Sequence, residues 1–291
     1  MNSPPVFPRA PTSSDWEAHL QLGFQRDATS TRLTHCRHHG PLRVQKTLYP
    51  EGSEVCHAII IHPPGGVVGG DRLKTEVHVA ADTRVLITTP GAAKWYRSNG
   101  QISQQDIALR VAAGAQLEWL PQESIFFDDA RVILNQTVQL DEQASFISSD
   151  IFCFGRSAAA ERYASGTITQ CSRILRGEQL IWHEQGSIEG AGAAMQSPLG
   201  LAGRSVCASV LGCGNPLSAA ALQALRAQSS ALLAAREETA LGGVSQMKSV
   251  IVARYLGNSS ETARLWQQLV WQHLRPALMG REAVVPRIWQ T

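Results

Sequence analysis

The sequence predicts a mainly β protein: a β-helix-like solenoid body of many short strands, with two α-helices near the C-terminus. Three observations lead to this prediction. Apolar and polar residues alternate with the period of a strand over most of the chain, a corner between strands recurs, and helical periodicity begins late. The 291 residues are 44% hydrophobic and 17% charged, which is typical of a folded globular protein.

The chain starts with a segment that has no periodicity. Residues 1–15 are rich in proline and serine, and we expect them to form a flexible arm, with residues 16–291 forming one domain. The start has no apolar signal-peptide core, and no later stretch has the length of a bilayer-spanning helix. We therefore expect neither secretion nor a membrane partner.

Charge and cysteine content narrow the class of protein further. The 26 basic and 24 acidic residues form no dense basic block, which argues against a nucleic-acid partner. The six cysteines include no C-x-x-C pair, and a chain of this length does not need disulfides to fold. Reduced thiols in the cytoplasm are the interpretation that fits best.

Strand patterns fill the region from residue 16 to about 214. In LKTEVHV (73–79) the odd-numbered residues are apolar or small, and the even-numbered ones are charged or imidazole, which predicts a half-buried strand. The segments IALRV (107–111) and QLEWL (116–120) alternate in the same way. CHAIIIH (56–62) is apolar enough to be covered on both faces.

A weak repeat links three of the strand junctions. Val79-AADT, Val111-AAGA and Leu140-DEQA each join an apolar strand end to a short corner, and their first residues lie 32 and 29 positions apart. This is how successive coils of a β-solenoid repeat. Taken alone, the pattern also fits ordinary hairpin turns of a β-sandwich.

The helical pattern begins at Asn215-Pro216, a capping residue followed by proline. We expect a helix over about 216–238, closed by Gly242-Gly243. After a strand over KSVIVARYL (248–256), Ser259 or Ser260 should cap a second helix over about 260–275 that ends at Pro276.

The glycine-rich segment HPPGGVVGGD (62–71) invites comparison with a phosphate-binding loop. A Walker loop needs Lys and Ser/Thr after its last glycine, whereas Asp71 and Arg72 stand here, and the Asp71 carboxylate would repel a phosphate. The glycines are better explained by a tight turn. Nucleotide binding by this chain is not expected.

For catalysis, the chain has no G-x-S-x-G elbow and no cysteine with a nucleophile signature. Two acids in a β-helix groove would suit a hydrolase or lyase, and this enzyme class is the alternative function. Most such acids are solvated or capping groups, and the sequence cannot pair them. The acids of the strand region are Asp71, Glu118, Glu123, Asp128, Asp129, Asp150 and Glu161.

For metal binding, His35, Cys36, His38 and His39 place four donors within five residues. The spacing is not that of a zinc finger. In an extended strand His35 and His39 share one face and His38 lies on the other, so closing a site requires a loop or another chain. The alternative is a group of exposed histidines before a turn.

Several segments together resemble one known family. The resemblance runs from about residue 16 to the end and keeps the motifs in family order, so the chain is similar to UreD, also called UreH, the family of urease accessory proteins. The segments that carry it are LRVQKTLYPEG (42–52), HPPGGVVGGD (62–71), TTPGAAKWYRS (88–98), LEWLPQESIFFDDA (117–130), ERY (161–163) and VIVARYLG before the last helix.

The resemblance implies a β-helix-like body with two C-terminal helices, in agreement with the strands and repeat above. It also implies a cytosolic scaffold, not an enzyme, that binds immature urease, recruits UreF and through it the GTPase UreG, and helps nickel reach the urease active site. No tightly bound cofactor is expected, only Ni²⁺ in transit. A homodimer within the complex is left open.

The resemblance further implies an interior, water-filled passage for nickel, lined by acidic and small polar residues. Asp71, Thr88 and Glu161 are the residues that this places on the path. Their alternatives are structural, since Asp71 can cap a turn, Thr88 can bond to backbone, and Glu161 can pair with Arg162 or Lys94. The segment Ala158–Ala160 departs from the expected pattern, which leaves the register of Glu161 less secure.

Overall fold

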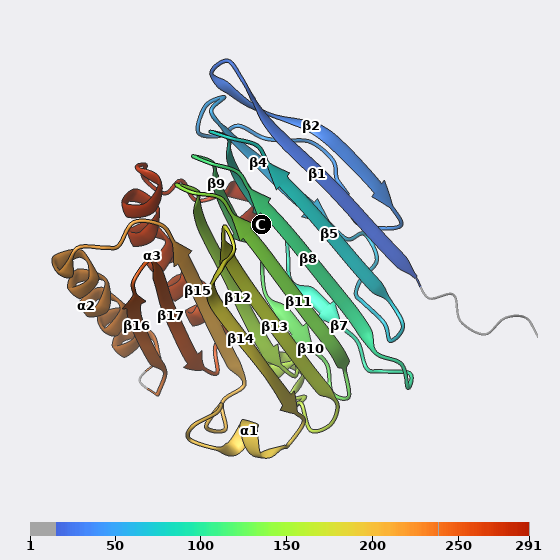
Figure 1. Cartoon of the computed structure of the whole chain (residues 1–291). Coiled ribbons are helices and arrows are strands. Elements are labelled where there is room, and N and C mark those ends of the chain that lie inside the picture. The colour runs from blue at the N-terminus through green and yellow to red at the C-terminus, as the bar shows by residue number, and fades with distance from the viewer. Residues whose placement is uncertain (1–15, 238, 291) are drawn as a thin grey trace, which may run out of the picture.

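A β-solenoid of about four turns forms the body of the protein, and it confirms the predicted fold class (Figure 1). The computed structural model describes residues 16–237 and 239–290. The arm predicted for residues 1–15 lies outside the described residues. Each coil has two long sides, which stack into two sheets, and a short third side.

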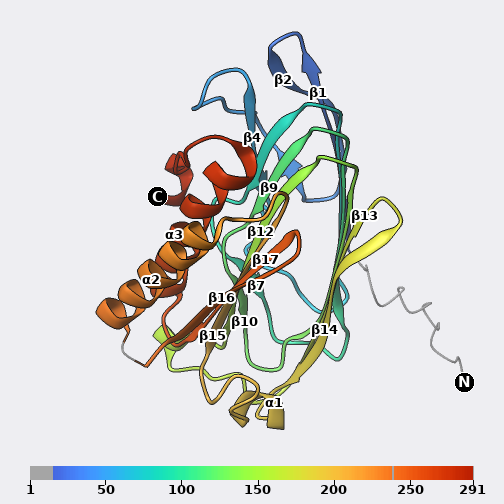
Figure 2. The ribbon, with the colours of Figure 1, turned by 60° about the vertical axis from the view of Figure 1, so that its left-hand side comes forward.

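The first sheet has seven strands, and we call it the open sheet because no helix in the described part of the chain covers its outer face (Figure 2). Its strands, in spatial order, are β14 (Gln179–Glu189), β13 (Thr167–Arg176), β11 (Arg131–Leu140), β8 (Ser103–Val111), β5 (Arg72–Val79), β1 (Glu17–Asp27) and β2 (Ser30–His39).

The second sheet, which we call the covered sheet, carries helices on its outer face (Figure 2). Its main path is β16 (Leu241–Met247), β17 (Val250–Gly257), β15 (Val206–Cys213), β12 (Ser145–Phe154), β9 (Gln116–Leu120), β6 (Arg84–Thr88), β4 (Val55–Ile61) and β3 (Arg43–Val44). The short third side consists of β7 (Ala93–Trp95) and β10 (Ser124–Phe126), and β10 also pairs with β12.

The strand register confirms the repeat read from the sequence. Val79 lies opposite Val111, and Val111 lies opposite Leu140, so the spacings of 32 and 29 residues are the lengths of two coils. All three corners turn through a residue in the left-handed region, with φ of 57° at Asp82, 68° at Gly114 and 60° at Gln143. Because β5, β8 and β11 pair in parallel, their corners belong to a solenoid and are not hairpin turns.

The third side explains the glycine-rich and aromatic motifs. Val67 bridges to Trp95, and stacking continues from Trp95 to Phe126 and from Phe126 to Phe154, each with ring centroids 6.1 Å apart. A side chain at Gly66 would collide with the Tyr96 ring. The motifs therefore recur because they occupy equivalent positions in successive coils.

The helices pack on the covered sheet and form a second apolar core with it. The two helices that pack there are α2 (Ala219–Arg236) and α3 (Ser260–Met279). A one-turn helix α1 (Ala193–Gln196) lies in a loop, and the other helical segments described are short 3₁₀ turns at Ser157–Ala159 and Arg287–Gln290. No helix among the described residues is long and apolar enough to span a membrane. The late helices are confirmed, while α1 was not predicted.

The predicted start of α2 at Asn215-Pro216 is wrong. The side chain of Gln246 bonds both the N–H and the carbonyl of Leu217, which holds this segment outside the helix. Ser218 is the cap instead, accepting a hydrogen bond from the N–H of Ala221 at 3.1 Å.

The predicted ends of both helices also shift. Gly242 and Gly243 lie in β16 and do not close α2, and a side chain at Gly242 would strike Leu233 of that helix. The second helix is capped by Ser259, one of the two predicted candidates, and continues through Pro276 to Met279, ending at Gly280, whose φ is 68°. Proline removes one backbone hydrogen bond without stopping the helix here.

A buried ionic network joins α3 to the solenoid. The Arg275 side chain, 0% exposed, donates to Glu118 of β9 at 3.0 Å and to Glu51 at 2.7 Å. Trp271 of α3 also donates to Glu118, at 2.6 Å, and His57 of β4 contacts Glu51 at 2.6 Å. Burial alone would raise the pKa of Glu51, but the bonds from His57 and Arg275 outweigh it and lower this pKa to about 2.

We expect Arg275→Ala to lower the free energy of unfolding by roughly 3–5 kcal/mol, because it leaves the Glu118 carboxylate buried without its cation. Arg97→Ala is the control, since it breaks a pair whose arginine is 69% exposed and should cost less than about 1 kcal/mol. Urea unfolding followed by circular dichroism measures both. Equal losses would show that the network is not a special constraint.

Candidate functional site

A layer of polar side chains runs through the space between the two sheets. On the open sheet the inward positions of successive strands include Gln105, Gln136, Gln170 and Glu184, which share the parity of apolar core residues on the same strands. On the covered sheet the inward polar residues are Ser148, Asp150, Ser209 and Arg254. The interior of the solenoid is therefore apolar near its edges and polar along its middle.

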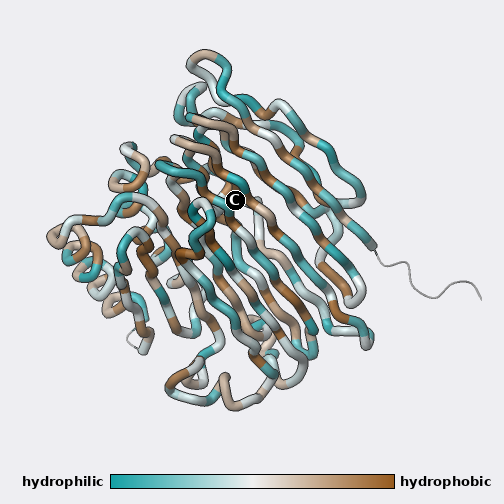
Figure 3. The backbone as a smooth tube through the Cα atoms, in the orientation of Figure 1, coloured by the Kyte–Doolittle hydropathy of each residue, from teal (hydrophilic) through white to brown (hydrophobic). Residues whose placement is uncertain are grey.

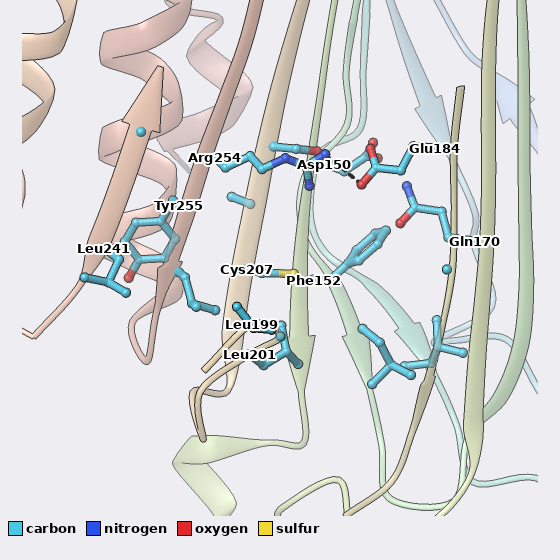
Figure 4. Close-up of a pocket in the computed structure, with 18 of the residues that line it drawn as sticks. Asp150, Phe152, Gln170, Glu184, Leu199, Leu201, Cys207, Leu241, Arg254 and Tyr255 are labelled. Atoms are coloured by element: carbon cyan, nitrogen blue, oxygen red, sulfur yellow. Dashed lines mark hydrogen bonds and ion pairs between the residues drawn. The ribbon is translucent and has the colours of Figure 1, made fainter. Parts of the chain in front are cut away.

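The widest part of this layer is a cavity of about 480 Å³ between β14 and the strands β15 to β17 (Figure 4). Its charged lining residues are Asp150, Glu184 and Arg254. Leu199 and Leu241 stand at its rim, with 98% and 56% of their surface exposed. The cavity thus combines a charged interior with an apolar mouth.

The topology explains why the cavity opens here. After β13 the chain reverses into β14, and β15, β17 and β16 also pair antiparallel, so the solenoid stops coiling. Among the described residues, no strand of the third side follows β10 and the end of β12. The two sheets consequently lack a closing side at this end.

Two smaller cavities continue inward from the first. One of about 90 Å³ shares Asp150, Phe152 and Gln170 with the wide cavity. It shares Pro121 and Gln122 with another of about 190 Å³, which lies beside α3 and Trp289. The three cavities therefore lie in succession from the open end of the solenoid to its helix-covered side.

Charge at the wide cavity is concentrated on two acids and one base. Burial and, to a smaller extent, the neighbouring Glu184 carboxylate together raise the pKa of Asp150 to about 6. Glu184 accepts a hydrogen bond from the Arg254 guanidinium at 2.8 Å. Figure 4 shows Arg254 and Glu184 reaching toward each other from opposite walls, with Asp150 beside them.

This arrangement suits a weakly held divalent cation. Two carboxylates and the Gln170 amide offer oxygen ligands, whereas tight transition-metal sites use several imidazole or thiolate groups. In the described part of the chain, no three His, Cys, Asp or Glu side chains are grouped as a metal centre. The cavity lining therefore offers oxygen ligands without forming a closed metal site.

The residues predicted for the nickel path lie apart from these cavities or next to them. Asp71, 5% exposed, accepts a bond from the N–H of Val68 at 2.9 Å and so caps its own glycine-rich turn. It precedes β5, and Glu161 lies in the loop before β13. Those strands are three spacings apart in the open sheet, or roughly 14 Å. The structure does not bring Asp71 and Glu161 together.

Thr88 lies beside this row of cavities. Its hydroxyl donates to the carbonyl of Leu120 at 2.6 Å and accepts from the indole of Trp289 at 2.8 Å. Its neighbour Thr89 lines the middle cavity, and Trp289 lines the cavity beside α3.

Glu161 forms a two-point ion pair with Arg156, at 2.8 and 3.0 Å, and not with Arg162 or Lys94. The hydrogen bonds from Arg156 lower the pKa of the Glu161 carboxyl. Metal contact by Asp71, Thr88 or Glu161 stays a prediction.

The His35-to-His39 cluster lies on β2, an edge strand of the open sheet, and its imidazoles and the Cys36 thiol are exposed. His35 and His39 share one face of the strand, as expected, and His38 and Cys36 point the other way. The cluster stands far along the sheet from the wide cavity, with five strands between β2 and β14. Its part in metal binding also stays a prediction.

Sequence reasoning named Asp150 only as one acid among many and missed Gln170, Glu184 and Arg254. The sequence did contain a sign of a polar interior, because Asp150 interrupts the otherwise apolar or small inward face of SFISSDIFCF (145–154). Polar residues at inward positions of adjacent coils would have pointed to the interior. The partner strands, however, had to be known first.

Comparison with known proteins gives consistent matches. The family model described as UreD urease accessory protein matches residues 17–290. The urease accessory protein UreD of Janthinobacterium sp. (strain Marseille) is 53% identical over 94% of this chain and 92% of its own length. The protein of the same name from Nitrosospira multiformis is 46% identical over 96% of this chain and 99% of its own length.

The raised pKa of Asp150 has a consequence for stability. Because the folded-state pKa of about 6 lies above the ordinary value of 3.8, ionisation of Asp150 penalises the fold as the pH rises from about 4 through 6. We expect Asp150→Asn to be more stable than the unchanged protein at pH 7.5, by up to about 3 kcal/mol. The difference should vanish near pH 3.5, as measured by urea unfolding at both pH values. A constant difference would contradict the raised pKa.

Proposed function

The chain belongs to the UreD family of urease accessory proteins, and we propose that it serves urease maturation as a non-catalytic scaffold whose interior carries nickel ions. The observation that supports the passage is a row of three cavities that share lining residues, two of them in the polar layer of the solenoid and the third beside α3. The names of its relatives support the accessory role.

The chemistry of the passage fits a cargo ion rather than a resident metal. Carboxylate, amide and hydroxyl oxygens from Asp150, Gln170 and Ser209 can replace part of the hydration shell of Ni²⁺ in turn. Each single contact is weak, so an ion held by them can leave again. A closed thiolate or imidazole cage would hold the ion too tightly for delivery.

The passage ends at surfaces suited to partner proteins. A mouth rimmed by Leu199 and Leu241 exposes apolar area that a partner can bury. We propose that immature urease and UreF are the partners, with the GTPase UreG recruited through UreF. This arrangement places GTP hydrolysis on UreG, in keeping with a glycine-rich loop that ends in Asp71. We also propose a cytoplasmic location, where the six cysteines, all free, remain reduced.

The scaffold role is tested by co-purification. In a complete urease expression system, the tagged chain should retain UreF and urease subunits on an affinity column. Deleting the chain should leave urease nearly free of nickel, as measured by metal analysis of the purified enzyme. Full nickel content in urease without this chain would refute the scaffold role.

The passage is tested separately by Asp150→Asn combined with Glu184→Gln. We expect these changes to lower nickel delivery to urease several-fold, because they remove the two carboxylates that line the cavity between β14 and β15 to β17. Complex formation on a sizing column should be unchanged, since the apolar rim residues Leu199 and Leu241 are left in place. Nickel content of urease per complex is the measurement.

The matched control is Glu142→Gln with Glu178→Gln, which makes the same charge change at two exposed positions. It should deliver nickel like the unchanged protein. Asp71→Ala with Glu161→Ala forms a third arm, which tests the residues carried over from the family motifs. If the Asp150 and Glu184 variant matches the control, the interior passage is wrong.

A further inference from the structure

Within the proposed passage, one feature opposes cation transport: Arg254 projects a positive charge into the widest cavity. It lies at an inward position of β17 in the covered sheet, next to Ser209 of β15. Its guanidinium crosses to β14 of the open sheet and donates to Glu184 at 2.8 Å (Figure 4). The pair thus bridges the two walls of the mouth.

Both residues are placed so that the bridge can break. The Arg254 side chain is 52% exposed and that of Glu184 is 27% exposed, in contrast to the fully buried Arg275. An arginine with this exposure can swing into water at little cost in solvation, because a pair open to solvent contributes little stability. Glu184, on a strand wall, stays inside the cavity.

The charges of the cavity balance only in part. Its charged lining residues are Asp150, Glu184 and Arg254, so two acids face one base. While Arg254 is paired, Glu184 is occupied and a metal ion meets an adjacent positive charge. Once Arg254 leaves, the Glu184 carboxylate becomes available to a divalent cation, beside Asp150 in the same cavity.

We propose that Arg254 is a tethered competitor of the metal ion for Glu184, which sets how weakly the passage holds its cargo. The inference rests on the proposed passage and adds the residue that sets how tightly the passage binds its ion. A metal ion that enters must displace the guanidinium, and the returning guanidinium helps to expel the ion. The carboxylates provide attraction, and Arg254 ensures release.

Direct nickel binding tests this inference without urease. Isothermal titration calorimetry of the full chain with Ni²⁺ should show that Arg254→Gln binds the ion roughly tenfold more tightly than the unchanged protein. Arg254→Lys keeps the charge and should stay within about threefold. The matched control is Arg173→Gln, which removes one charge from an exposed position on β13.

A double-variant comparison identifies the mechanism. If Arg254 competes for Glu184, then Arg254→Gln should tighten binding much less when Glu184→Gln is already present. An equal gain in both backgrounds, or a gain matched by Arg173→Gln, would mean only a general charge effect and would overturn the proposal. Circular dichroism of each variant confirms that it is folded.

The experiment separates this inference from the passage itself. If Asp150→Asn and Glu184→Gln weaken Ni²⁺ binding but Arg254→Gln leaves it unchanged, the carboxylate site stands and the role of Arg254 is refuted. If neither the acids nor Arg254 affects Ni²⁺ binding, the passage fails and the competitor role fails with it.

Discussion

The Arg275 guanidinium is the constraint on which the arrangement of the molecule depends. It joins the last long helix to Glu118 in the middle of the covered sheet and to Glu51 in the loop before β4. A charge buried to this degree is tolerated only when its partners are in place, so the network forces one register of helix on sheet. That register also sets Trp289 against Thr88, beside the inner end of the cavities.

The rest of the body follows from stacking. Parallel coils bring equivalent residues together, which favours close-packed glycines and aromatic rings on the narrow third side and apolar rows near the corners. The same stacking turns isolated polar residues such as Gln136 and Ser172 into a continuous layer, where they contact at 3.3 Å. A polar layer inside a core costs stability unless it is satisfied or hydrated, so its persistence through several coils indicates a use.

The sequence predicted the parts of the fold that depend on local pattern. Corner spacing and strand alternation located the coils, and the cap of α3 was narrowed to Ser259 or Ser260 because capping is a local interaction. The start of α2 was missed because a distant side chain, Gln246, holds Leu217. Gly242 was predicted to end the helix, but it lies in β16, where its lack of a side chain leaves room for Leu233 of α2.

The site was harder to foresee, since its walls come from strands that are neighbours only after folding. Asp150 and Glu184 are 34 positions apart in the chain and lie in different sheets. The motif residues Asp71 and Thr88 were visible in sequence, yet they form hydrogen bonds with backbone groups and with Trp289. Family motifs here mark the architecture of the coils as much as their chemistry.

The repeating corner has a consequence for the length of the proposed passage. Because each coil adds one strand spacing of about 4.8 Å to the stack, the length of the interior route changes in whole steps while its cross-section stays the same. Gaining or losing one coil would lengthen or shorten the stack by one such spacing. A solenoid therefore lets the distance between two docking surfaces be adjusted without redesigning the walls between them.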